Sequence, residues 1–243
     1  MTRSLLLALV VALPAVAADP KAVLEKAVAA HGGAAAIDKY AGQKLTVKGT
    51  IMAQGMEIGL TGTILRAHPD KEKTTATLNV ADMELPLLAV TNGKAASMSV
   101  GGQAQPLDDD RKAEALFGAY ASNLTRLTPL LKAGGPYTLK AGPEAAVGGN
   151  PAVGVIVEHA DFKPVTLYFD KETGRLVKSV RAGKDQDGQD AERESLFADY
   201  KAVSGVQLPH ALTSTVGGKP LSKFTVEKYE LLEKVDASEF AVE

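Results

Sequence analysis

The four histidines are the side chains best suited to acid–base or metal chemistry, because the chain contains no cysteine. They are His31, His68, His159 and His210, and no two of them have the helical spacing of a metal-binding pair. His31 precedes two glycines, and His68 and His210 each adjoin a proline, as in turns. The sequence therefore predicts no metal site, no cofactor and no thiol nucleophile.

An acidic segment resembles part of a calcium-binding loop. Asp185, Asp187, Gly188 and Glu194 match the later positions of an EF-hand loop. The first ligand position falls on Gly183, which has no carboxylate. Asp-Gly is also a favoured hairpin turn, so we interpret the segment as a solvated turn between strands.

Two other patterns are candidate sites. Residues 108–110 are all aspartates, but they begin a predicted helix, where carboxylates cap free N–H groups. Serine, histidine and aspartate are all present, yet no Gly-x-Ser-x-Gly motif occurs. A catalytic triad brought together only by the fold stays open as an alternative, and with it a hydrolase.

Two helical segments and many short strands must position any site. Residues 19–40 predict a helix capped by Asp19, with Pro20 in its first turn and a break at the glycines after His31. Residues 107–132 predict a second helix. Between residues 43 and 100, apolar and polar residues alternate over five strands, with Asn92-Gly93 as a hairpin turn. Further strands follow between residues 137 and 231.

One-sided strands and covering helices predict either a packed core or a hollow with apolar walls. Aliphatic walls suit acyl chains, since each buried CH₂ contributes about 0.8 kcal/mol without directional demands. The expected ligand-binding residues are Leu45, Val47, Ile58, Leu60, Leu78, Leu85, Leu87, Val155, Val157, Leu167, Phe117 and Tyr120. The alternative, that each of them is core packing, stays open at this point.

The N-terminus has the layout of a secretory signal peptide. Arg3 is followed by an apolar run over residues 5–13, by Pro14 and by small residues before position 19. We expect residues 1–18 to be removed and residues 19–243 to form a single domain in the periplasm or outside the cell. No cysteine at the junction could carry a lipid anchor, and no later segment is apolar enough to span a membrane. A net charge of −2 without basic clusters argues against nucleic-acid binding.

Three stretches carry a resemblance to a known family. They are AAHGGAAAID at residues 29–38, PVTLYFDKETGRLV at residues 164–177, and DYK, GVQLPH, FTV and VDASEF between residues 199 and 240. Together they resemble the LolA-like, outer-membrane lipoprotein-sorting superfamily. This resemblance implies a mainly antiparallel β fold with α (α+β), an unclosed half-barrel of about eleven strands covered by lid helices. It also implies an apolar hollow that holds acyl chains.

The function expected from these features is that of an exported binding or carrier protein, not an enzyme. Its ligand would be a lipid, a lipoprotein acyl chain or another apolar molecule, and the protein would act as a monomer. The alternative is a protein-binding or envelope-sensing module that has the same fold, an envelope protein as its partner and no lipid cargo.

Overall fold

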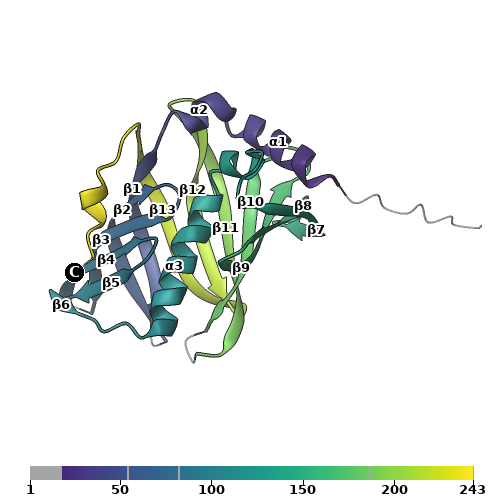
Figure 1. The fold of residues 1–243 in the computed structure, drawn as a ribbon. Helices are drawn as coiled ribbons and strands as arrows, with labels where there is room; N and C mark the ends of the chain where they lie inside the picture. The colour runs from purple at the N-terminus through teal and green to yellow at the C-terminus, as the bar shows by residue number, and fades with distance from the viewer. Residues whose placement is uncertain (1–17, 54, 82, 186–187, 243) are drawn as a thin grey trace, which may run out of the picture.

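The computed structural model describes residues 18–53, 55–81, 83–185 and 188–242. In these residues the chain forms a single antiparallel sheet of 13 strands, with α-helices on one of its faces (Figure 1). The two outermost strands do not pair with each other, so the sheet is an unclosed half-barrel. The expected fold class is therefore confirmed, with 13 strands where about eleven were expected.

The helices are α1 (Pro20–Ala30), α2 (Ala34–Asp38) and α3 (Asp109–Leu124), with short 3₁₀ helices η1 (Thr128–Leu131) and η2 (Ala237–Phe240). The strands are β1 (Gly42–Ala53), β2 (Met56–Ala67), β3 (Lys71–Val80), β4 (Met83–Asn92), β5 (Ala96–Val100), β6 (Gln103–Ala104), β7 (Thr138–Val147), β8 (Asn150–His159), β9 (Phe162–Asp170), β10 (Leu176–Lys184), β11 (Asp190–Val203), β12 (Val206–Val216) and β13 (Lys219–Leu232).

The chain builds the sheet from its middle outward. The spatial order is β6-β5-β4-β3-β2-β1-β13-β12-β11-β10-β9-β8-β7, so the first and last strands pair at the centre. The expected hairpin after β4 is present, and the Asn92 side chain accepts hydrogen bonds from the N–H groups of Lys94 (3.2 Å) and Ala95 (2.9 Å). Because β6 and β7 lie at opposite edges, the segment that joins them must cross the sheet. That segment contains α3, which lies in front of the central strands in Figure 1.

The N-terminal helical segment has the predicted caps. Asp19 accepts a hydrogen bond from the N–H of Lys21 at 3.1 Å, and His31 follows the last residue of α1. The carbonyl of His31 accepts a hydrogen bond from the N–H of Gln207 at 3.0 Å. This bond fixes the corner between α1 and α2 against the start of β12.

The helix expected over residues 107–132 is shorter than predicted. It begins after Asp108, which accepts a hydrogen bond from the N–H of Arg111 at 2.8 Å, and α3 ends at Leu124. Leu127 has a φ of 65°, and a 3₁₀ turn that carries Pro129 follows. Proline lacks an N–H and its ring disfavours helical backbone in the preceding residues, so a continuous helix could not pass this point.

Two separate hydrophobic clusters support the fold. The larger joins α1, η1 and the C-terminal half of α3 to β8–β10, and its fully buried members include Leu24, Leu127, Val155 and Leu167. The smaller lies on β1, β2, β3 and β13 around Leu45 and Val47. The helices thus pack tightly on β8–β10. The smaller cluster consists of strand residues, so over the central strands the helices do not take part in it.

We expect Gly32→Ala to destabilise the protein strongly. Gly32 has a φ of 110°, and a Cβ there would lie 2.1 Å from the carbonyl oxygen of Gly205. The matched control is Gly33→Ala, where φ is 85° but no atom lies within 4 Å of the added Cβ. The control carries backbone strain of about 1–3 kcal/mol, and Gly32→Ala adds a clash with backbone. Urea unfolding at pH 7 should give the lower midpoint for Gly32→Ala; equal midpoints would contradict this account.

We also expect stability to decrease as pH falls from about 6.5 to about 4 through His68. Its Nδ1 contacts Oδ1 of Asn123 on α3, and burial lowers its pKa to about 4, with Arg126 and Arg66 acting in the same direction. An unfolded imidazole titrates near 6.5, so the unfolded chain takes up a proton first as pH falls. The effect is up to about 3 kcal/mol. Unfolding free energies of His68→Gln at pH 7 and 4.5 should differ less than those of the parent.

Candidate ligand-binding site

A cavity of about 1000 Å³ lies between the central strands and α3. Its walls include residues of β2, β3, β5, β10, β11, β12 and β13, together with one side of α3. This volume lies at the upper end of the range of small-molecule sites, about 300–1,000 Å³. The sheet and its crossover helix therefore meet without filling the space between them.

One row of cavity residues is apolar. Phe197, Leu212, Phe224 and Leu60 line the cavity, and strand pairing sets them side by side across β11, β12, β13, β1 and β2. Gly49 occupies the β1 position in this row, between Phe224 and Leu60. A Cβ at Gly49 would lie 2.7 Å from Cδ1 of Phe224, so its absence makes room for the Phe224 ring. The row is a continuous hydrophobic strip.

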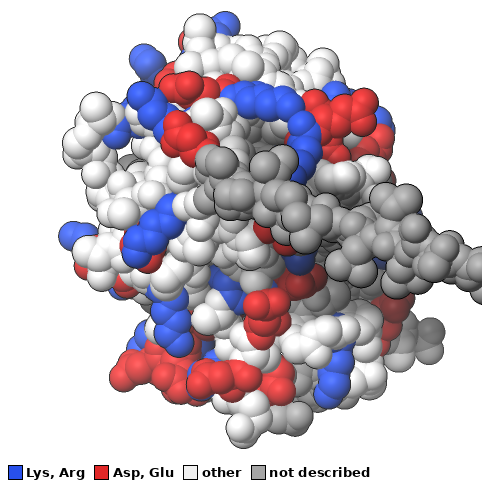
Figure 2. All heavy atoms as spheres, turned by 90° about the vertical axis from the view of Figure 1, so that its right-hand side faces the viewer, with Lys and Arg blue, Asp and Glu red and all other residues white. Residues whose placement is uncertain are grey.

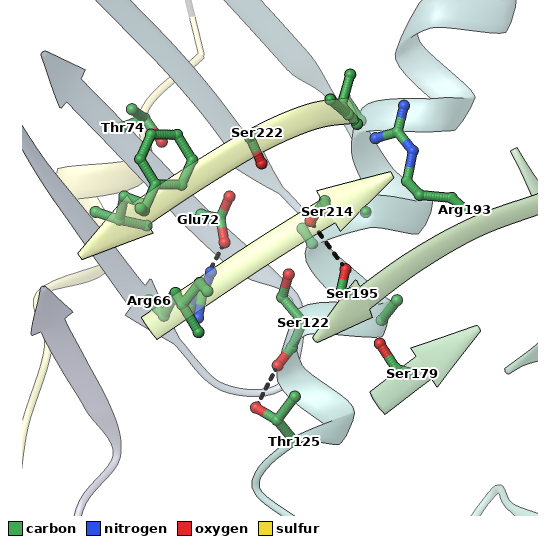
Figure 3. Close-up of a pocket in the computed structure, with 18 of the residues that line it drawn as sticks. Arg66, Glu72, Thr74, Ser122, Thr125, Ser179, Arg193, Ser195, Ser214 and Ser222 are labelled. Atoms are coloured by element: carbon green, nitrogen blue, oxygen red, sulfur yellow. Dashed lines mark hydrogen bonds and ion pairs between the residues drawn. The ribbon is translucent and has the colours of Figure 1, made fainter. Parts of the chain in front are cut away.

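A second row consists of serines. Ser179, Ser195, Ser214 and Ser222 are successive cross-strand partners on β10, β11, β12 and β13, and all four line the cavity. The hydroxyls of Ser195 and Ser214 are hydrogen-bonded at 3.1 Å (Figure 3). On three of these strands a serine stands two residues from a member of the apolar row, which places both on one face about 7 Å apart. The cavity floor is therefore hydroxyl-rich beside the hydrophobic strip.

An ion cluster closes the end of the cavity beyond the serines. Arg181 on β10 and Arg193 on β11 are cross-strand partners, and Glu114 of α3 reaches both. Arg181 binds both carboxylate oxygens of Glu114, at 2.7 and 3.2 Å, and lies 4.8 Å from the ring centroid of Phe117. Arg193 lies 3.3 Å from Glu114. This cluster ties α3 to the sheet at a point where hydrophobic packing does not.

The two arginines of the cluster differ in how fully they are paired. Arg181 is 9% exposed and also donates to the carbonyl of Ala182 at 2.9 Å. Nε of Arg193 is buried and has no hydrogen-bond partner. Burial lowers the pKa of the Arg193 guanidinium from its usual value, Glu114 opposes this, and the charge of Arg181 adds to it. Arg193 is therefore a cation with unused donor capacity at the cavity wall.

The opposite wall carries a second ion pair. Nε of Arg66 on β2 lies 2.7 Å from Oε2 of Glu72 on β3, and Thr74 stands two residues further along β3 (Figure 3). These side chains are 15% and 25% exposed, so each charge is largely removed from water and satisfied by the other. This pair leaves no excess charge at that wall.

The twelve residues predicted to bind ligand fall in three places. Leu60 lines the cavity. Around it pack the remaining predicted residues of the smaller cluster, namely Leu45, Val47, Ile58 and Leu78, with Leu85 and Leu87 partly buried against them. The others, Phe117, Tyr120, Val155, Val157 and Leu167, belong to the larger cluster under the helices. Direct contact of any of the twelve with a ligand stays a prediction.

Sequence reasoning missed the polar side of the cavity. The four serines and Arg193 carry no motif, and alternation of apolar and polar residues on a strand predicts that the polar side chains face water. A usable signal was present, since Ser195, Ser214 and Ser222 each stand two residues from a large apolar residue. Side chains two residues apart share a face of a strand, so these serines had to lie on the apolar face.

No described contact pairs a histidine with a serine hydroxyl. Nδ1 of His31 lies 2.7 Å from the carbonyl of Ala27, and Nδ1 of His210 lies 3.1 Å from that of Leu208. His68 contacts Asn123, as described above. Within the described residues, no group of three or more acidic or histidine side chains is placed to hold a metal ion.

Two sequence predictions fall partly beyond the described residues. Residues 186 and 187 of the calcium-like segment lie outside them, as does the signal-peptide region up to residue 17. Across the ranges that the structure describes, we find no helix with both the length and the apolarity required to cross a bilayer.

Comparisons with known proteins support the fold alone. No protein-family model matches the sequence, and no curated protein matches it. Among solved structures, a domain named for outer membrane lipoprotein sorting from Vibrio parahaemolyticus is 13% identical, with a TM-score of 0.53 over 91% of this chain and 95% of that one. A LolA superfamily protein from Nitrosomonas europaea is 12% identical, with a TM-score of 0.56 over 93% and 99%.

A third similar structure is a DUF1329 family protein from Desulfovibrio piger, 11% identical, with a TM-score of 0.55 over 92% of this chain and 98% of that one. All three alignments cover more than nine tenths of this chain. The resemblance seen in the sequence is thus confirmed in three dimensions, and the chain has the LolA-like fold.

Proposed function

We propose that this chain is an exported binding or carrier protein for a lipid, a lipoprotein acyl chain or another apolar ligand. The observation that carries the proposal is the cavity of about 1000 Å³ with a continuous hydrophobic strip along its floor. The LolA-like fold supports it. The sequence features of residues 1–18 place the protein in the periplasm or outside the cell, where residues 19–243 act as one domain and as a monomer.

Binding of an alkyl chain to the strip requires no directional contact. Each CH₂ removed from water contributes about 0.8 kcal/mol, so a chain of twelve contributes about 10 kcal/mol. Immobilisation of the ligand opposes this by several kcal/mol, at least about 4. The remainder is at most about 6 kcal/mol. This value lies between the free energies of a millimolar and a micromolar complex, about 4 and 8 kcal/mol. A carrier needs affinities that allow release, and we expect affinities in this range for the strip.

The proposal predicts that the purified protein takes up apolar molecules stoichiometrically. N-phenyl-1-naphthylamine should gain fluorescence on titration with the protein and saturate near one molecule per chain, because the cavity shields it from water. Organic extraction followed by lipid mass spectrometry should recover a co-purifying lipid. No probe uptake and no lipid would contradict the proposal, and a specific envelope protein captured without either would favour the protein-binding alternative.

We further expect Ser122→Phe to weaken probe binding at least about tenfold, a loss of ~1.4 kcal/mol. Ser122 lies on the cavity side of α3, so a benzyl group there would occupy ligand volume (Figure 3). The matched control is Ala113→Phe, which adds the same ring at an exposed α3 position outside the cavity lining. Its affinity should stay within about twofold of the parent. Equal affinities for the two variants would show that the probe binds elsewhere.

A further inference from the structure

We propose that the cavity selects amphipathic ligands with one anionic head group, a carboxylate or a phosphate, which Arg193 and the serine row bind. This inference rests on the proposed function and specifies its ligand. The alkyl chain would then lie along the strip of Phe197, Leu212, Phe224 and Leu60.

The ion cluster has an excess of positive charge. Two guanidinium groups share the single carboxylate of Glu114, and Arg181 takes both of its oxygens. The nearby Lys184 is already paired with Asp190 at 2.9 Å. Asp108 and Asp110 also line the cavity, but they stand at the start of α3, where Asp108 caps the N–H of Arg111. The helix end balances part of their charge. Asp185 also lines the cavity, and it accepts a hydrogen bond from the N–H of Gln189 at 2.9 Å. Among the described ion pairs, Arg181 and Arg193 share the carboxylate of Glu114.

Arg193 is the member of the cluster that can take another acceptor. Its Nη1 lies 3.3 Å from Glu114, while its Nε is buried and has no hydrogen-bond partner. The Arg193 side chain lines the cavity and is 25% exposed, so its accessible N–H groups can meet a ligand oxygen. A guanidinium presents neighbouring N–H groups in a planar fork that matches the oxygens of a carboxylate or phosphate.

The serine row supplies further donors beside this arginine. Ser195 stands two residues from Arg193 on β11, and Ser179 stands two residues from Arg181 on β10, so the pairs lie in neighbouring rows of one face. In the Ser195–Ser214 hydrogen bond one hydroxyl donates, which leaves the proton of the other available to a ligand oxygen. An anion at this point would meet both a cation and hydroxyl donors.

The order of the rows matches the polarity of an acidic amphiphile. Along β11 the face toward the cavity carries Arg193, then Ser195, then Phe197, about 7 Å apart from one to the next. Along the strand a cation, a hydroxyl and an aromatic ring follow one another. In the same order they would meet the head group, the first carbons and the alkyl chain of the ligand. A ligand without charge would reach the strip equally well but would offer the Arg193 guanidinium no charged partner.

The outer surface does not explain such a preference. Figure 2 shows acidic and basic side chains intermingled over the face that it displays, and the net charge of the chain is −2. A mixed surface with a slightly negative total does not attract anions over distance. The displayed face and the net charge give no reason for such a preference, so we assign the selectivity to the cavity.

The test measures displacement of N-phenyl-1-naphthylamine by dodecanoate, dodecyl phosphate and dodecanol, all below their aggregation limits. The two anions should compete at least about tenfold better than the alcohol. Arg193→Gln should weaken both anions by about tenfold, or ~1.4 kcal/mol, and leave dodecanol within about twofold. Ser195→Ala, which keeps the arginine, should weaken the anions by a smaller factor.

The matched control is Lys223→Gln, which removes one positive charge from an exposed residue of β13 adjacent to Ser222, on the opposite face of the sheet. It should change none of the three affinities.

The anion that competes more strongly identifies carboxylate or phosphate as the preferred head group. Thermal unfolding of each variant confirms folding, and Arg193→Lys, which keeps the charge without the fork, should restore part of the anion affinity.

Two results would overturn the inference, and they are distinguishable. If all three ligands displace the probe equally and Arg193→Gln changes nothing, the anionic head-group site is wrong while the apolar cavity stands. If none of the three displaces the probe and the probe itself does not bind, both the inference and the proposed function fail.

Discussion

The contact between Glu114 and Arg181 is the interaction on which the cavity depends. The C-terminal half of α3 is held by hydrophobic packing against β8–β10, but its N-terminal half has no such support. There the bidentate ion pair, at 2.7 and 3.2 Å, ties the helix to β10. An ion pair between long side chains spans a gap that apolar packing would close. The helix is thus fixed in place and the space beneath it stays unfilled.

This arrangement follows from the topology of the sheet. Because β1 and β13 pair at its centre, β6 and β7 end at opposite edges, and the connecting segment has to cross the face between them. One helix of 16 residues cannot cover the inner face of a curved sheet of 13 strands. The polar residues left on that face line the cavity, which gives it hydroxyls and charges beside its hydrophobic strip.

The sequence predicted the fold more fully than the site. Three sequence features reflect the conformational preferences of neighbouring residues and were predicted correctly. They are the alternation of apolar residues along the strands, the Asn92-Gly93 turn and the helix cap at Asp19. The end of α3 was misplaced because helical spacing of leucines continues past Leu124 into the turn before Pro129. The serine row could not be read as a site, since it depends on the register of four strands that only the folded sheet sets.

The most direct test of the central claim, that an alkyl chain occupies the cavity, is a crystal structure with bound 12-bromododecanoate. Anomalous scattering locates the bromine at the end of the chain independently of any interpretation of the rest of the ligand. We predict a single bromine peak over the hydrophobic strip near Leu60 and Phe224. Bromine density only on the outer surface, or a cavity closed by its own side chains, would contradict this account.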